Sequence, residues 1–135
     1  MTPENPSFLV ADDDADTRAL LKRVLQLSFP GCSVLSISDP STLEELAATA
    51  KPQVAFIDWF FPHGTTGPQL CRRLKSQHPT RNTAVVLITG LRHDSKSRFK
   101  AARSGADLLL KKPLLAEEVE GYARALLERV KATSD

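Results

Sequence analysis

Val54-Ala55-Phe56-Ile57-Asp58 is an apolar run that ends on a carboxylate. Five residues are too few for a stable helix, and the run lies between Pro52 and the turn sequence Pro62-His63-Gly64. A short apolar run of this kind predicts a strand that is buried on both faces. Such strands belong to parallel sheets covered by helices, and these sheets bind ligands at the carboxyl ends of their strands. We therefore expect Asp58 to be the reactive group of this protein.

Four further apolar runs predict strands, at residues 8–11, 32–37, 84–88 and 107–111. A segment with helical periodicity follows each predicted strand. The first ends at about residue 28, and the others are residues 41–50, 68–75, 92–103 and 116–131. Regular alternation of strand and helix predicts an α/β fold with a five-stranded parallel sheet, right-handed crossovers and helices on both faces. We expect one domain over residues 1–135, with its core at about 8–131.

The helices carry apolar stripes that predict their buried faces. The segment 92–103 has a thin stripe with Phe99 and Ala102 as its inward candidates, so we expect a weakly held helix there. Ser41 and Glu44 have the spacing of a capping box, and Asp14 or Asp16 is expected to cap the first helix. The expected stripes are Leu20, Leu21, Val24, Leu25 and Leu27; Leu43, Leu46, Ala47 and Ala50; Leu70, Cys71 and Leu74; and Leu115, Val119, Tyr122, Ala123, Leu126 and Val130.

Composition excludes several classes of protein. The 135 residues carry a net charge of +2, which is too small to argue for nucleic-acid binding by itself. No apolar stretch approaches the ~20 residues that cross a bilayer, so we expect a cytoplasmic protein without membrane contact. Cys32 and Cys71 lack metal-ligand spacing, and we expect two free thiols.

Polar side chains stand where the predicted strands end. Asp12 and Asp13 follow the first strand, Asp58 ends the third, Thr89 ends the fourth and Lys112 follows the fifth. The carboxyl ends of parallel strands meet at one edge of a sheet, so we expect these side chains to converge.

Three converging carboxylates repel one another and raise one another's pKa. A hard divalent cation relieves this repulsion, and Mg²⁺ suits a site with few carboxylates and several waters. Lys112 supplies a mobile positive charge for an anionic group, and Thr89 supplies a hydroxyl donor. The set predicts a site for a phosphoryl group on Asp58.

Each of these residues also has an ordinary structural explanation. An acidic residue after a strand is most often a turn former or a helix cap, and this explanation suits Asp14 better than a ligand role. Independent caps would rarely fall at successive strand ends together with Thr89 and Lys112, which favours a functional site.

The chain resembles the receiver domain of two-component response regulators, typified by the chemotaxis regulator. The resemblance runs from Phe8 to Val130, and its motifs are specific through their order and spacing. They are Leu9-Val10-Ala11-Asp12-Asp13-Asp14, Phe56-Ile57-Asp58 with Pro62 four residues on, Val86-Leu87-Ile88-Thr89-Gly90, and Gly105-Ala106-Asp107 leading to Lys112-Pro113-Leu114.

This resemblance implies a flavodoxin-like doubly wound sheet with strand order 2-1-3-4-5 and five helices. It implies that Asp58 accepts a phosphoryl group from a histidine kinase or phosphotransfer protein. Asp12 and Asp13 would hold Mg²⁺ with Asp58 and the backbone carbonyl of Phe60. Thr89 would be the switch hydroxyl and Lys112 its ion-pair partner. The Lys112–Pro113 bond is often cis in the family, which makes Pro113 a candidate cis-proline.

Several positions depart from the family pattern. Leu109 occupies the place of the usual switch aromatic, and the loop of residues 61–67 is one residue longer than is common. In the family, the side chains at the positions of Phe60 and Leu91 flank the path of the attacking water. Both are apolar here, so we hypothesise slow self-dephosphorylation.

The resemblance also implies an output surface formed by the segments 92–103, 107–111 and 116–131. We expect a downstream protein to bind there. An acidic partner would suit the basic residues Arg92, Lys96, Arg98, Lys100 and Arg103. A homodimer is the other expected arrangement. We do not expect direct DNA contact, because no helix-turn-helix pattern follows. His63, His78 and His93 are expected on the surface.

Two alternatives differ in class from a switching receiver. A pseudo-receiver would keep the fold and bind proteins constitutively, which Leu109 and the longer loop favour. A phosphatase with an aspartyl nucleophile usually needs a second acid two residues on, where this chain has Phe60. The expectation is therefore a signalling domain rather than an enzyme.

Overall fold

The computed structural model describes residues 5–90 and 94–133. Its strands are β1 (Ser7–Ala11), β2 (Ser33–Ile37), β3 (Val54–Asp58), β4 (Ala84–Thr89) and β5 (Leu108–Lys111). They form one parallel sheet in the order β2-β1-β3-β4-β5. The predicted strands and the predicted strand order are confirmed.

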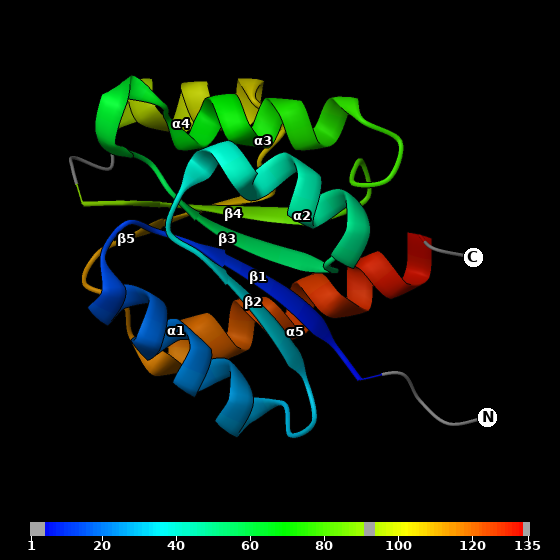
Figure 1. The fold of residues 1–135 in the computed structure, drawn as a ribbon. Coiled ribbons are helices and arrows are strands. Elements are labelled where there is room, and N and C mark those ends of the chain that lie inside the picture. The colour runs from blue at the N-terminus through cyan, green and yellow to red at the C-terminus, as the bar shows by residue number, and fades with distance from the viewer. Residues whose placement is uncertain (1–4, 91–93, 134–135) are drawn as a thin grey trace.

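Helices cover both faces of this sheet (Figure 1). α1 (Ala15–Ser28) and α5 (Ala116–Thr133) lie on one face, while α2 (Leu43–Ala50), α3 (Gly67–Ser76) and α4 (Ser95–Arg103) lie on the other. The strand β3 is fully buried, and its side chains alternate between the two layers. Val54 and Phe56 belong to the core beneath α1 and α5, whereas Ala55 and Ile57 belong to the core beneath α2 and α3.

The predicted buried faces of α1, α2 and α5 were too wide. Leu21, Val24 and Leu25 are buried on α1, but the stripe's outer members Leu20 and Leu27 are exposed. An α-helix on a sheet buries only its central rows, so apolar residues at the flanks of a stripe remain in solvent. The same correction applies to Leu46, Ala50, Leu115 and Tyr122.

The helix starts differ in part from the predicted caps. Asp14 caps α1 by accepting hydrogen bonds from the amides of Asp16 and Thr17. The predicted capping box of Ser41 and Glu44 is wrong, because Pro40 starts a short 3-10 turn, η1 (Pro40–Thr42), which Asp39 caps instead. A capping box does occur at α3, between Thr66 and Gln69.

The α4 helix is anchored by few side chains. Phe99 is 61% exposed and Ala102 is exposed, so both inward candidates were wrong; Ala101 is buried instead. Gly105 ends this segment with φ of +91°, a conformation that glycine adopts without strain. Leu91, Arg92 and His93, on which predictions were made, lie outside the described residues.

Two further sequence expectations concern the membrane and the thiols. Within residues 5–90 and 94–133, no helix has the length and apolarity that a membrane span requires. Both cysteines are free thiols, with Cys71 buried and Cys32 half-buried.

Candidate functional site

The polar residues at the strand ends meet at the carboxyl edge of the sheet. Asp58 closes β3, and the Nζ atom of Lys112 lies 3.3 Å from its Oδ1 atom. The same Nζ atom lies 3.5 Å from Oδ2 of Asp12, which follows β1. One ammonium group therefore faces two carboxylates that come from different strands.

Asp12, Asp13 and Asp58 form what we call the acidic cluster. Each offers one carboxylate oxygen, and these oxygens lie within 4.8 Å of one another. Asp12 and Asp58 are buried, whereas Asp13 is exposed. Such a set of oxygen ligands with one side open to solvent fits a hard cation that keeps several waters.

One atom of this cluster supports the fit with a cation directly. Oδ2 of Asp12 is buried and accepts no hydrogen bond from any residue in the described part of the chain. The ammonium of Lys112, 3.5 Å away, is shared with Asp58, so a bound cation would further stabilise this buried oxygen. The residues present therefore suit a divalent metal ion.

The electrostatics of the acidic cluster oppose ionisation. Burial raises the pKa of the Asp12 carboxyl, and the hydrogen bond from Asp14 and the charge of Lys112 offset this only in part. Burial also raises the pKa of Asp58, and the negative charge of Asp12 adds to the effect. Burial alone would lower the pKa of Lys112, but the charges of Asp58 and Asp12 together outweigh it and raise that pKa.

Thr89 and Lys112 are joined through the backbone. The amide of Lys112 donates to the carbonyl oxygen of Thr89 over 2.8 Å, which keeps the end of β4 beside the residue that follows β5. Thr89 is buried, and the Lys112–Pro113 peptide bond is cis.

The backbone after Asp58 is packed tightly against α3. A Cβ atom at Gly67 would lie 2.5 Å from the carbonyl oxygen of Asp58, so only glycine fits there. The amide of Gly67 donates to the carbonyl of Trp59 over 2.7 Å, and Phe60 pairs with Thr66 in an antiparallel bridge. The first turn of α3 thereby fixes the strand end that carries the Asp58 carboxylate.

The aromatic residues after Asp58 have different surroundings. Trp59 and Phe61 are buried in the core beneath α2 and α3, while Phe60 between them is 50% exposed. The segment 59–61 is therefore held by two aromatic side chains and presents the third to solvent. Phe60 stands two residues after Asp58, and its side chain has no polar group that could orient water.

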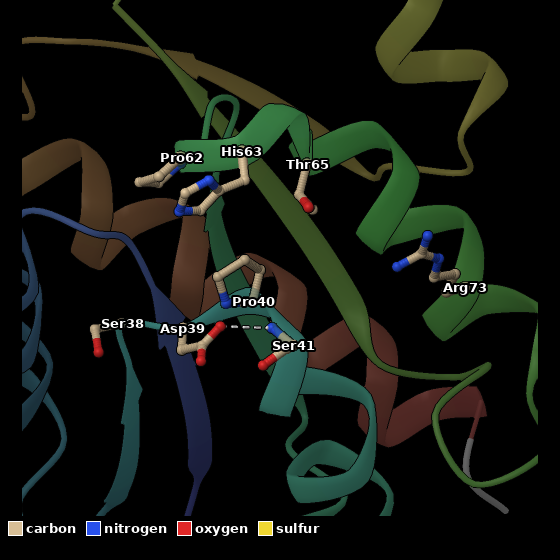
Figure 2. A pocket seen from close by; sticks show the side chains of 8 residues that line it. All are labelled: Ser38, Asp39, Pro40, Ser41, Pro62, His63, Thr65 and Arg73. Atoms are coloured by element: carbon tan, nitrogen blue, oxygen red, sulfur yellow. Dashed lines mark hydrogen bonds between the residues drawn. The ribbon is translucent and has the colours of Figure 1, made fainter.

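A groove of about 490 Å³ lies beside this loop (Figure 2). It separates the η1 turn from the loop, and His63 projects into it from a left-handed backbone with φ of +68°. The acidic cluster does not line this groove. Its lining residues are Ser38, Asp39, Pro40, Ser41, Pro62, His63, Thr65 and Arg73.

Leu109, which we predicted to stand in the place of the switch aromatic, lies on the α4 side of β5. It is half-buried and lines a hollow of about 300 Å³ between α4 and β5. His63 and His78 are exposed, as expected for surface histidines.

Two residues make contacts at the sheet edges for which the sequence predicted no role. Arg18, which lies outside the apolar stripe predicted for α1, donates from Nη1 to the carbonyl oxygen of Asp12 over 2.8 Å. Asp107, at the amino-terminal edge of the sheet, accepts from Lys75 and Arg129 and from the amide of Val85. Helical periodicity places Arg18 outside the core, and no local pattern reports a bond to a strand end.

Comparisons with known proteins agree with this geometry. Residues 8–124 match the family model described as the response regulator receiver domain. The phosphate regulon transcriptional regulatory protein PhoB of Pseudomonas aeruginosa is 26% identical over 123 residues, 91% of this chain and 52% of that protein. The chain thus spans about half the length of the curated relatives it matches.

Solved structures of similar fold were also found. The signal receiver domain of a DNA-binding response regulator from Colwellia psychrerythraea 34H is 27% identical, with a TM-score of 0.84 over 92% of this chain and 99% of that one. A CheY-like receiver domain protein from Methanospirillum hungatei JF-1 shares the fold at 17% identity, with a TM-score of 0.85 over 96% of this chain and 98% of that one.

Proposed function

Because the chain belongs to the response regulator receiver domain family, we propose that Asp58 accepts a phosphoryl group from a histidine kinase or phosphotransfer protein. The observation that carries this proposal is the contact of Lys112 with both Asp58 and Asp12 beside an open, exposed Asp13. Positive charge next to an enclosed carboxylate is what a phosphoryl group on that carboxylate requires.

Each residue of the site has a defined task in the transfer. An oxygen of Asp58 attacks phosphorus, the bond from phosphorus to the donor nitrogen breaks, and its electron pair leaves with the imidazole. Lys112 is placed to bind an oxygen of the transferred group, because its ammonium already lies against Asp58. Asp12, Asp13, Asp58 and the carbonyl of Phe60 would hold Mg²⁺. That ion, when bound, supplies charge stabilisation for the phosphoryl oxygens.

The signal would leave through Thr89 and the surface of α4, β5 and α5. Thr89 is buried at the end of β4, next to Lys112, so a new contact with a phosphoryl oxygen would displace it locally. A downstream protein, or a second copy of the chain, would read the resulting change. Lys96, Arg98, Lys100 and Arg103 on α4 suit an acidic partner, and we expect no direct DNA contact by this domain.

The test is a mass measurement on the protein treated with acetyl phosphate and Mg²⁺. Wild type is expected to gain the mass of one phosphoryl group, and Asp58→Asn to gain none. Asp39→Asn is the matched control, because Asp39 also follows a strand at this edge but lies outside the acidic cluster. We expect this variant to behave as wild type.

The mass measurement, combined with hydrogen exchange, distinguishes this proposal from a non-switching pseudo-receiver, which Leu109 favours. No mass gain on wild-type protein would refute the proposed phosphoacceptor. A mass gain without any change in hydrogen exchange over α4, β5 and α5 would support a phosphorylated but non-switching module.

A further inference from the structure

Asp12 is held at four points by different parts of the chain. Its amide donates to the carbonyl of Ile37 over 3.1 Å, at the end of β2. Its Oδ1 atom accepts from the amide of Asp14 over 2.9 Å, and its Oδ2 atom faces Lys112. The fourth contact is the bond from Arg18 to its carbonyl oxygen.

The backbone of Arg18 is held in place by the first turn of α1. Its own amide donates to the carbonyl of Asp14 over 3.1 Å, in the first turn of α1. Asp14 caps this turn, since its side chain accepts from Asp16 and from the amide and hydroxyl of Thr17. The half-buried guanidinium therefore reaches back from an ordered helix start to the strand end.

The carbonyl that Arg18 holds belongs to the peptide unit between Asp12 and Asp13. A peptide unit is planar, so fixing its oxygen also fixes the direction in which the backbone of Asp13 leaves. Asp13 is exposed, whereas the side chain of Asp12 is enclosed. We propose that Arg18 is a positioning residue that sets Asp13 relative to Asp12 for binding a divalent cation. This inference rests on the proposed function, which supplies the cation.

Electrostatics alone predict the opposite effect of Arg18. A positive side chain next to a cation site repels the cation, so removing it would tighten metal binding. Positioning predicts weaker metal binding after its removal, because Mg²⁺ demands near-ideal octahedral geometry. The sign of the change therefore distinguishes the two explanations.

The experiment measures the Mg²⁺ dissociation constant of the whole chain by calorimetry and by fluorescence of Trp59, the single tryptophan, which follows Asp58. Arg18→Met is expected to raise the constant about tenfold, equivalent to about 1.4 kcal/mol. Arg18→Lys retains a donor and should lie between wild type and Arg18→Met. Arg23→Met removes the same charge from an exposed site on α1 and should stay within about twofold of wild type.

A second readout separates positioning from general loss of structure. The Mg²⁺ concentration for half-maximal phosphorylation by acetyl phosphate should rise with the dissociation constant in Arg18→Met. The maximal rate at saturating Mg²⁺ should stay near that of wild type. A misfolded variant would lose the maximal rate instead. In that case the Mg²⁺ dissociation constant of Arg18→Lys decides. A constant several-fold above that of wild type supports positioning, and a wild-type constant contradicts it.

Three results would overturn the inference. They are an Arg18→Met constant at or below that of wild type, an equal rise in Arg23→Met, or an unchanged Mg²⁺ requirement for phosphorylation. In each case the phosphorylation of wild type would leave the proposed function intact. Wild type that neither binds Mg²⁺ nor gains a phosphoryl group would refute the proposed function itself.

Discussion

At the scale of single residues, the negative charges of the acidic cluster are unfavourable in the folded protein. Asp12 and Asp58 are both buried and face one another across Lys112, whose single charge cannot neutralise both. Their pKa values are raised mainly by burial, so their charged forms are disfavoured in the folded protein. The charged cluster therefore lowers the stability of the folded protein unless a bound cation compensates its negative charge.

The first prediction concerns pH and the metal-free protein. A carboxyl with a raised folded-state pKa contributes its stability fully below its unfolded pKa, near 3.8, and loses it as pH rises through the folded value. In EDTA, Asp58→Asn should therefore be more stable than wild type at pH 7.5, by on the order of 1 kcal/mol.

Urea unfolding at several pH values would measure this difference. The advantage of Asp58→Asn should shrink as pH falls toward the unfolded pKa. Asp39→Asn is the control, since hydrogen bonds with Ser41 hold the pKa of Asp39 below its usual value. An advantage that grows on acidification would contradict the assignment.

The second prediction concerns Phe60 and the lifetime of the phosphoryl group. Its half-exposed ring beside the acceptor cannot hydrogen-bond a water molecule for attack on phosphorus. Phe60→Asn introduces such a group and should shorten the phosphoryl half-life about tenfold. Phe99→Asn changes a similarly exposed ring on α4 and should leave the half-life unchanged. The half-life is followed by intact mass after the donor is removed, and equal half-lives would refute the role of Phe60.

At the scale of elements, α3 and α4 are attached very differently to the same face of the sheet. α3 buries Gly67, Leu70, Cys71 and Leu74, and a capping box closes its start. α4 buries only Ala101 among its described residues, and its exposed Phe99 packs against the guanidinium of Arg103 at 5.7 Å. An element with little buried apolar surface opens at low free-energy cost, which suits it to move when the site changes.

The third prediction follows from this contrast. Amide hydrogens of α4 should exchange faster than those of α3, by about a hundredfold or more if their opening free energies differ by about 3 kcal/mol. Phosphorylation, or Mg²⁺ with a phosphoryl mimic, should change exchange in α4 and leave α3 unchanged. Equal protection of the two helices in the unmodified protein would contradict a weakly held α4.

At the scale of the whole molecule, the two edges of the sheet have different tasks. The carboxyl edge carries the acidic cluster, and the amino-terminal edge carries Asp107. One carboxylate oxygen of Asp107 accepts from Lys75 of α3 over 2.9 Å and from the amide of Val85 over 2.7 Å, while the other pairs with Arg129 of α5. Asp107 therefore joins both helical layers to the sheet, away from the reactive edge.

The fourth prediction separates these two tasks. Asp107→Asn should lower the free energy of unfolding by about 2–3 kcal/mol, because Lys75 loses its half-buried partner. Its Mg²⁺ dissociation constant should remain within about twofold of wild type. Glu128→Gln makes the same charge change at an exposed site on α5 and should alter neither quantity. A shift of metal affinity in Asp107→Asn would show that the two edges are coupled.

Much of this fold could be predicted from local patterns. Residues 54–57 predict a buried strand, because a short apolar run between Pro52 and a turn is typical of a strand covered on both faces. The polar residues at the strand ends converge because parallel strands end at the same edge, and this holds for any sequence with that alternation. The sequence alone therefore predicts the sheet, its strand ends and the gathering of Asp12, Asp58 and Lys112.

Other features required the tertiary structure. The stripe of α1 predicted Leu20 and Leu27 as buried, but the sheet covers only part of the helix surface. Arg18 lies outside the apolar stripe of α1, yet its guanidinium reaches the carbonyl of Asp12. Asp107 looked like part of a motif and proved to bind two helices and a strand. Periodicity records which side of an element is apolar, whereas contacts between separate elements depend on how the packed layers place their backbones and long polar side chains.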